Sequence, residues 1–253
     1  MRVRRAGRAA LAAALLALVA ACANPFGREY EYEEQFYLAV DGSALMTINT
    51  SIPALVALHG LALDPSPRAF LDQQKVRRLY EAAGCQVARV GQPWYRHGRR
   101  FIQIQLTTGD VRTLGACGPL AWGTYTFEPS AGRIRYQEIV GPAAGGDPGA
   151  ANWDGNELVA FKLHLPSRIT FHNVRLLAGG GPGDVERGNI LTWEQRLADR
   201  RAGKPVNIEV QMDEQSILYR TLWLFGGSFL AAVCVMAGLI WWTVRKGRAR
   251  IGN

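Results

Sequence analysis

The sequence predicts an α+β fold, in which an exported domain rich in antiparallel β-sheet, with two short helices, precedes one C-terminal transmembrane helix. Short runs of alternating apolar and polar residues recur between turn residues, which is typical of antiparallel strands. Two runs with helical spacing interrupt them. From Thr221 to Val244 no residue is charged, and a helix of that length can cross a hydrocarbon core of about 30 Å.

The first half of the exported part contains both predicted helices. Strand-like runs flank Asp41-Gly42, a strong signal for a hairpin. An apolar run after Pro53 predicts the first helix, because proline favours the first turn. For the second helix, Asp72 is the expected N-cap and Gly84 the expected end.

The rest of the exported part is mainly strand. The runs 85–90 and 99–108 predict strands, and Asp110 predicts the cap of a further short helical segment. A hairpin is expected across Ser130-Ala131-Gly132. After the glycine- and proline-rich loop 141–149, four strand-like runs follow: "ELVAFKLHL", "RITFHN", "NILTWEQ" and "VNIEVQM".

The N-terminus has the layout of a secretory signal. Residues 1–21 combine a basic start with a short apolar run, and Val19 to Cys22 resembles the lipobox of bacterial lipoproteins. We therefore expect a signal peptide of the lipoprotein type over 1–21, with Cys22 lipidated. Cleavage after Ala23 and an uncleaved anchor are the alternatives.

The C-terminus predicts the topology of the chain. Residues 217–244 form the expected transmembrane helix, with Trp223, Trp241 and Trp242 near its ends, where such rings favour the lipid headgroups. Residues 245–253 are basic, so the positive-inside rule places this tail in the cytoplasm. The chain is then a single-pass protein of the bacterial cytoplasmic membrane, with the domain 22–216 outside.

The formal net charge of +8 reflects these two ends of the chain. The residues before Cys22 and the tail hold four basic side chains each and no acidic ones, so removing these eight charges leaves the exported part at zero. The sequence pI near 9.6 is thus explained by topology signals. Nucleic acid is not an expected partner.

The cysteines predict one disulfide. Cys22 lies at the processing site and Cys234 in the predicted span, which leaves Cys85 and Cys117 in the exported domain, where disulfides persist. Two buried thiols are the alternative, because the sequence does not show how far apart the two residues lie.

The end of the exported domain contains a proline-containing strand, an asparagine and a Gly-Asn-x-x-Thr-Trp strand, here Pro166, Asn173, Gly188, Asn189, Thr192 and Trp193. In this pattern it resembles the LppM-like domain of bacterial envelope lipoproteins. The order of lipobox, α+β domain, transmembrane helix and basic tail is also similar. The resemblance implies a non-catalytic domain that handles lipids at the cell envelope.

No catalytic or metal-binding pattern is present in the sequence. His164 and His172 flank Pro166 and fit two paired strands better than a zinc site, and Asp154-Gly155 fits a turn. No serine lies in a nucleophile elbow, and no glycine-rich loop leads from a strand into a helix as a phosphate site requires. We therefore predict no enzyme activity, no cofactor and no metal site.

One cluster suggests a contact with lipid headgroups. At an expected hairpin tip, aromatic rings stand beside guanidinium groups, as suits the headgroup zone of a bilayer. Its members are Trp94, Tyr95, Arg96, Arg99 and Arg100. A solvated turn is the alternative. The chain is thus predicted to be a membrane-anchored extracytoplasmic module that binds or handles envelope lipids. Alternatively, it is an assembly subunit that meets other membrane proteins through its span.

Overall fold

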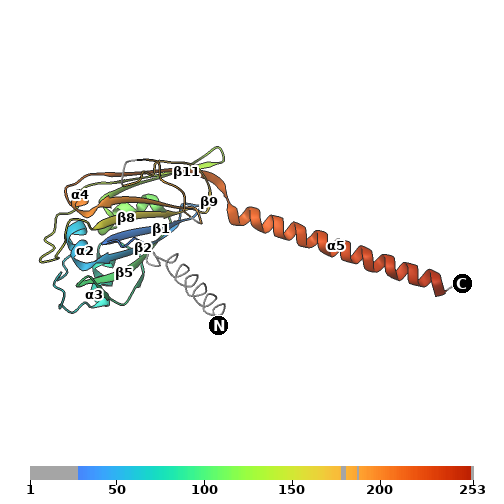
Figure 1. The fold of residues 1–253 in the computed structure, drawn as a ribbon, viewed down its shortest axis with the longest axis horizontal. Coiled ribbons are helices and arrows are strands. Elements are labelled where there is room, and N and C mark those ends of the chain that lie inside the picture. Colours follow the sequence, from blue (N-terminus) through green and yellow to red (C-terminus); the bar gives the residue numbers. More distant parts are fainter. Residues whose placement is uncertain (1–27, 178–180, 187, 252–253) are drawn as a thin grey trace, which may run out of the picture. The chain divides into compact units, whose positions relative to one another are not determined.

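The computed structural model describes residues 28–177, 181–186 and 188–251. The chain divides into two units after Tyr30, and the second unit, Glu31–Asn253, is compact. The predicted signal peptide and Cys22 lie outside the described residues. The α+β fold class is confirmed in the second unit, where two mainly antiparallel sheets are accompanied by short helices and followed by one long helix (Figure 1).

The larger sheet, sheet A, has seven strands in the order β10-β8-β1-β2-β5-β3, with β4 also paired to β5. Its strands are antiparallel neighbours except β1 and β8, which run parallel. The strands are β1 (Tyr32–Leu38), β2 (Ala44–Ser51), β3 (Val87–Val90), β4 (Trp94–Arg96), β5 (Arg99–Thr108), β8 (Leu158–His164) and β10 (Ile190–Arg196).

The smaller sheet, sheet B, is antiparallel in the order β6-β7-β11-β9. Its strands are β6 (Gly123–Ser130), β7 (Arg133–Val140), β9 (Ser167–His172) and β11 (Val206–Ser216). Every second residue of a strand points to the same face, and these faces of the two sheets form one apolar core. Phe36 of β1 marks the contact, because its ring centroid lies 6.1 Å from that of Tyr125 and 6.5 Å from that of Tyr136.

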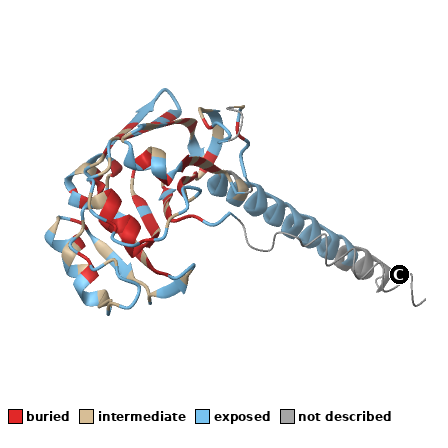
Figure 2. Cartoon of the chain, turned by 60° about the vertical axis from the view of Figure 1, so that its left-hand side comes forward, coloured by how far each residue is buried: buried red, intermediate tan, exposed pale blue. Residues whose placement is uncertain are grey.

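Helix α2 (Ile52–His59) is the first of the two expected helices. Ser51 caps it by accepting a hydrogen bond from the backbone N–H of Ala54, and proline stands in its first turn as expected. All its residues except His59 are buried, and Figure 2 shows that buried residues gather in the interior of the domain. Loop 141–149 passes its last turn, where the N–H of Ala144 donates to the carbonyl of Leu58.

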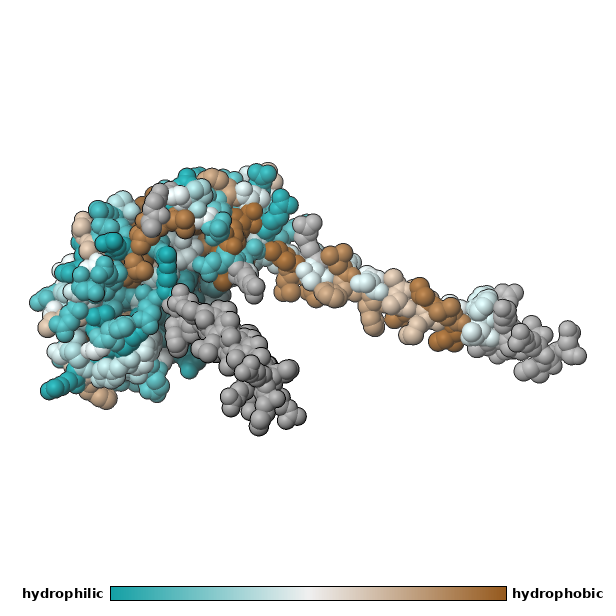
Figure 3. Space-filling model, viewed as in Figure 1, coloured by the Kyte–Doolittle hydropathy of each residue, from teal (hydrophilic) through white to brown (hydrophobic). Residues whose placement is uncertain are grey.

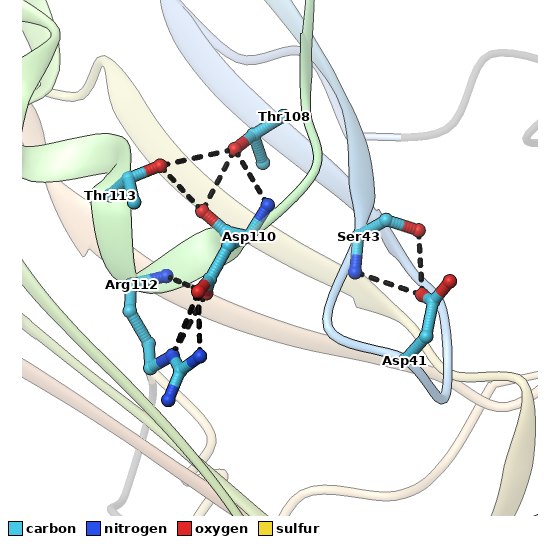
Figure 4. A network of polar contacts seen from close by, with 6 residues as sticks. All are labelled: Asp41, Ser43, Thr108, Asp110, Arg112 and Thr113. Carbon is cyan, nitrogen blue, oxygen red and sulfur yellow. Dashed lines mark hydrogen bonds and ion pairs between the residues drawn. The ribbon is translucent and has the colours of Figure 1, made fainter.

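Helix α3 (Gln73–Ala82) has the expected cap at Asp72, whose side chain accepts from the N–H of Gln74. The predicted disulfide between Cys85 and Cys117 is confirmed, and it ties the segment after α3 to the 3₁₀ helices η1 (Val111–Ala116) and η2 (Gly118–Leu120). Asp110 caps η1 as predicted, and its carboxylate also holds the guanidinium of Arg112 (Figure 4).

Two further helices follow in the last quarter of the chain. Helix α4 (Leu197–Arg201) adds to the two expected short helices. Helix α5 (Ile217–Ile251) follows β11 without a loop, and the N–H of Ile217 donates to the carbonyl of Pro166 over 3.0 Å. Within α5, Ile217–Thr243 is long and apolar enough to cross a membrane. Figure 3 shows the apolar side chains along it.

One prediction about strand pairing is wrong. His164 and His172 were expected on two paired strands, but β8 belongs to sheet A and β9 to sheet B. The two residues between these strands, Leu165 and Pro166, carry the chain from one sheet to the other. His164 instead stacks on Tyr37, with ring centroids 4.1 Å apart.

Candidate functional site

The predicted aromatic and basic cluster lies on a hairpin, as expected. Strands β4 and β5 are joined by His97 and Gly98, which both have positive φ, so the turn is tight and leads directly into β5. Strand alternation divides the cluster between two faces. Trp94, Arg96 and Arg99 belong to one face, whereas Tyr95 and Arg100 belong to the other.

Arg99 is buried and holds a buried carboxylate. Its Nε lies 3.0 Å from Oε1 of Glu31, whose side chain is 3 % exposed. The indole N–H of Trp153 donates to the same oxygen over 2.9 Å, and Arg99 also donates to the carbonyl of Ala151. Arg99 therefore joins the start of β5 to the start of β1 and to the loop before β8.

Arg100 is buried on the core-facing side and holds a loop. Its guanidinium donates to the carbonyl of Asp64 over 2.8 Å and to that of Ser66 over 3.0 Å. The hydroxyl of Tyr95 donates to the carbonyl of Pro67 over 3.0 Å. Three hydrogen bonds from the hairpin thus fix loop 61–72, which precedes α3.

These contacts correct the predicted role of two arginines. Arg99 and Arg100 were expected to be exposed turn charges in contact with lipid headgroups, but both are buried. Because both guanidinium groups are buried and contact Glu31 or backbone carbonyls, they stabilise the fold and do not face solvent. Arg96 packs its guanidinium 4.2 Å from the centroid of the Phe101 ring.

The aromatic members of the cluster are accessible, and a third exposed ring lies in the loop that Tyr95 contacts. Tyr95 is 65 % exposed and Trp94 is 37 % exposed. Phe70 is 92 % exposed, in the loop that Tyr95 and Arg100 hold. Phe70 and Tyr95 are called the distal aromatic surface below, whereas Trp94 lies on the other face of the hairpin. Phe70 is not among the residues predicted from the sequence, although an isolated phenylalanine between Pro67 and the Asp72 cap was the available signal.

The distal aromatic surface and the start of α5 lie at opposite ends of sheet A. Phe101 pairs with Ser51 at the end where β1 begins, whereas Tyr37 pairs with His164 at the other end. Helix α5 starts at the latter end, through the hydrogen bond from Ile217 to Pro166. About 20 Å of strand separates the two ends. The hairpin therefore lies about one strand length from the start of α5.

The interior of the domain is filled by large side chains. Among the residues that the structure describes, the largest fully buried ones include Tyr32, Phe36, Tyr80 and Tyr136. A pocket of about 60 Å³ lies beside the disulfide, lined in part by Leu106, whereas ligand sites usually measure about 300–1,000 Å³. The exposed rings of Phe70 and Tyr95 lie at the surface of the domain and do not line this pocket. Within the described segments, no three histidine, cysteine or acidic side chains gather as a metal site.

Comparison with known proteins shows a distant similarity of fold. No family model matches the sequence, and no curated protein matches it significantly. A solved structure with a related fold is the NMR structure of the folded domain of LppM from Mycobacterium tuberculosis. The two are 10% identical with a TM-score of 0.39, over 74% of this chain and 92% of that chain. A similarity this distant gives no basis for transferring a function.

Proposed function

We propose that this chain is a membrane-anchored, non-catalytic domain of the bacterial envelope that binds amphipathic lipids through its distal aromatic surface. Helix α5 supplies the anchor, because Ile217–Thr243 is apolar and long enough to span the bilayer. The domain lies outside the cytoplasm and the basic tail inside it. Cys22 carries a lipid that adds a second attachment.

The exposure of Phe70 on a fixed loop carries this proposal. A phenylalanine that is 92 % exposed leaves its apolar surface in water, and burying such a ring stabilises a complex by about 1.5–3 kcal/mol. The loop is already held by Arg100 and Tyr95, so binding needs little further ordering. Arg68, two residues before Phe70, is exposed and suits an anionic headgroup.

A vesicle-capture experiment tests the proposal with the full chain. The protein is reconstituted into nanodiscs of phosphatidylcholine and mixed with vesicles of phosphatidylglycerol or of phosphatidylcholine. We expect capture of the phosphatidylglycerol vesicles, with weaker capture at high salt. Phe70→Ser should weaken capture about tenfold, because the burial of one ring is lost.

Phe171→Ser is the matched control, because Phe171 is also exposed but lies on β9 of the other sheet. It should leave capture unchanged. Equal capture by wild type and Phe70→Ser, or a loss in the Phe171→Ser variant alone, would contradict the proposed surface. Capture that does not depend on vesicle charge would contradict the anionic preference.

The transmembrane helix favours a second candidate function, an assembly subunit. Thr221, Gly227 and Ser228 lie among apolar residues in the first turns of α5, and small residues of this kind allow close packing of helices in membranes. Cys234 is a free thiol exposed on α5 and serves as a probe. Crosslinking of Cys234 to another membrane protein, lost in Gly227→Leu but kept in Phe70→Ser, would support this candidate.

A further inference from the structure

Two carboxyl groups lie inside the domain, one on the inner face of each sheet. Glu34 of β1 lies between Tyr32 and Phe36 on the core-facing side of sheet A, and its residue is 0 % exposed. Glu138 of β7 lies on the core-facing side of sheet B and is 1 % exposed. Most of the buried side chains around them are apolar or aromatic. A buried carboxylate is costly unless it is paired or protonated.

Each carboxyl group has a tyrosine partner on its own strand. Tyr32 donates its hydroxyl proton to Oε1 of Glu34, and Tyr136 donates to Oε2 of Glu138 over 2.9 Å. The second oxygens, Oε2 of Glu34 and Oε1 of Glu138, are buried without a hydrogen-bond partner. Each carboxyl group therefore keeps one oxygen on which a proton can reside.

The groups around the pair supply little positive charge. Arg200 of α4 acts on Glu34 electrostatically, but its NH groups donate to the carbonyls of Val140 and Gly141. The other titratable groups that act on the pair are neutral hydroxyls. These hydroxyls, from β1, α3, β6 and β7, belong to Tyr32, Tyr80, Tyr125 and Tyr136. On α2, Nε2 of His59 lies 2.8 Å from the Tyr32 hydroxyl.

The environment favours the protonated form of both acids. Burial raises the pKa of Glu138 to about 7, although the hydrogen bond from Tyr136 acts in the opposite direction. Burial and the charge of Glu138 raise the pKa of Glu34 well above its usual value, against the effects of Tyr32 and Arg200. The charge balance also favours a bound proton. Arg200 supplies one positive charge beside the two acids, so one proton on Glu34 or Glu138 makes the cluster neutral.

We propose that Glu34 and Glu138 together hold a proton between the two sheets, and that its loss as the pH rises loosens the packing of the sheets. The folded protein binds more protons here than the unfolded chain, whose carboxyl groups ionise near their usual pKa of about 4.3. Stability from this pair is therefore present at low pH and is lost as the pH rises toward and above 7. This proton site is independent of the distal aromatic surface.

Infrared spectroscopy on the full chain in nanodiscs tests the site directly, because a protonated carboxyl group absorbs separately from carboxylates. We expect a protonated-carboxyl band at pH 6 that disappears between about pH 6 and 9, with Glu138→Gln removing or shifting it. Above the pH range in which His59 titrates, the midpoint of thermal unfolding of the wild type should fall by about 2–4 °C between pH 6.5 and 9. The decrease in Glu138→Gln should be smaller.

Glu33→Gln is the control on the same strand. Glu33 points to the opposite face, where Lys162 binds it over 2.8 Å. Burial alone would raise the pKa of Glu33, but its hydrogen bonds, first that from Lys162, lower the pKa overall. This control should keep both the band and the alkaline decrease. Absence of the band in wild type at pH 6, or its persistence in the double variant Glu34→Gln/Glu138→Gln, overturns the proposal. If Glu138→Gln fails to fold, the titration of the wild-type band decides alone.

Discussion

At the residue scale, the arginines around the β4–β5 hairpin differ in their surroundings rather than in their chemistry. Arg99 and Arg100 are adjacent in sequence, yet one binds a buried carboxylate and the other binds backbone carbonyls. Arg68, on the loop that Arg100 holds, is exposed. The same side chain therefore stabilises the fold at two positions and can meet a ligand at the third.

Replacing Arg99 should destabilise the domain strongly. Arg99→Ser leaves the carboxylate of Glu31 buried without its cation, and breaking a buried ion pair in this way costs about 3–5 kcal/mol. Urea denaturation of the purified chain measures the loss. Arg68→Ser is the control and should change the free energy of unfolding by less than about 0.5 kcal/mol. Equal effects of the two substitutions would show that the Arg99–Glu31 contact contributes nothing.

His59 should make the fold sensitive to acid. Its ring is enclosed between Tyr32 and Trp122, with centroids 5.2 and 4.4 Å away, and burial lowers its pKa to about 4. The folded state thus keeps His59 neutral while the unfolded chain protonates it near pH 6.5. Stability is therefore fully present above pH 6.5 and is lost as the pH falls toward 4, by about 3 kcal/mol.

Comparison with His59→Gln isolates this contribution, because all other groups titrate in both proteins. The difference in unfolding free energy between wild type and variant should shrink as the pH falls from 7 to 4.5. Parallel pH profiles of the two proteins would exclude a neutral, partly buried His59.

At the scale of elements, helix α2 depends on a loop distant in sequence. The N–H groups of Ala144 and Gly145 donate to the carbonyls of Leu58 and Ala57, in the last turn of α2. The loop approaches so closely that a Cβ at Gly146 would lie 2.1 Å from the carbonyl oxygen of Val56. A glycine-rich loop is therefore used here for close packing.

Gly146→Ala should force α2 and loop 141–149 apart. We expect a loss of about 1–3 kcal/mol in unfolding free energy, as for other overpacked sites. The measurement is thermal or urea unfolding. Gly109→Ala is the control, because a Cβ there meets nothing within 4 Å. A Gly146→Ala variant as stable as this control would mean that the loop can move without cost.

The disulfide should contribute a measurable share of the stability. Cys85 and Cys117 are 32 residues apart in sequence, and closing a loop of that length stabilises a fold by about 3–4 kcal/mol in the chain-entropy model. The double variant Cys85→Ala/Cys117→Ala should unfold at correspondingly lower urea concentration. Reduction of the wild type should give the same shift, and labelling before reduction should modify Cys234 but neither of the paired cysteines. Full labelling of all three would refute the bond.

At the scale of the whole molecule, the direction of sheet A relates the anchor to the proposed binding surface. Helix α5 is hydrogen-bonded at one end of the sheet, whereas Tyr95 and the loop that carries Phe70 lie at the other. This surface lies about one strand length from the start of α5. It can therefore contact lipid other than the headgroups that surround α5. This separation suits a domain that holds or presents a lipid.

The proposed topology predicts the result of proteolysis. In spheroplasts, added protease should digest the domain and leave a fragment that contains α5 and the C-terminal tail, because the basic residues after the span keep the tail in the cytoplasm. An epitope at the C-terminus should survive until the membrane is permeabilised. Its loss from intact spheroplasts would reverse the orientation.

The sequence by itself determined the local structure and the apolar span. The caps at Asp72 and Asp110, the hairpins around Gly42 and Gly132 and the long apolar helix were all predictable, because each depends on neighbouring residues. The pairing of the two exported cysteines followed from counting them, since only two were available.

The tertiary structure alone decided which side chains are buried and what they contact. Arg99 binds Glu31, which lies 68 residues earlier in the chain. Loop 141–149 contacts α2, about 90 residues earlier. The two inward-facing glutamates, Glu34 and Glu138, belong to different sheets. Strand alternation at Glu34 or Arg100 predicts a face but not what covers it. Contacts between distant segments depend on how the sheets stack, so neither the buried acids nor the exposed Phe70 could be assigned a role before the fold was known.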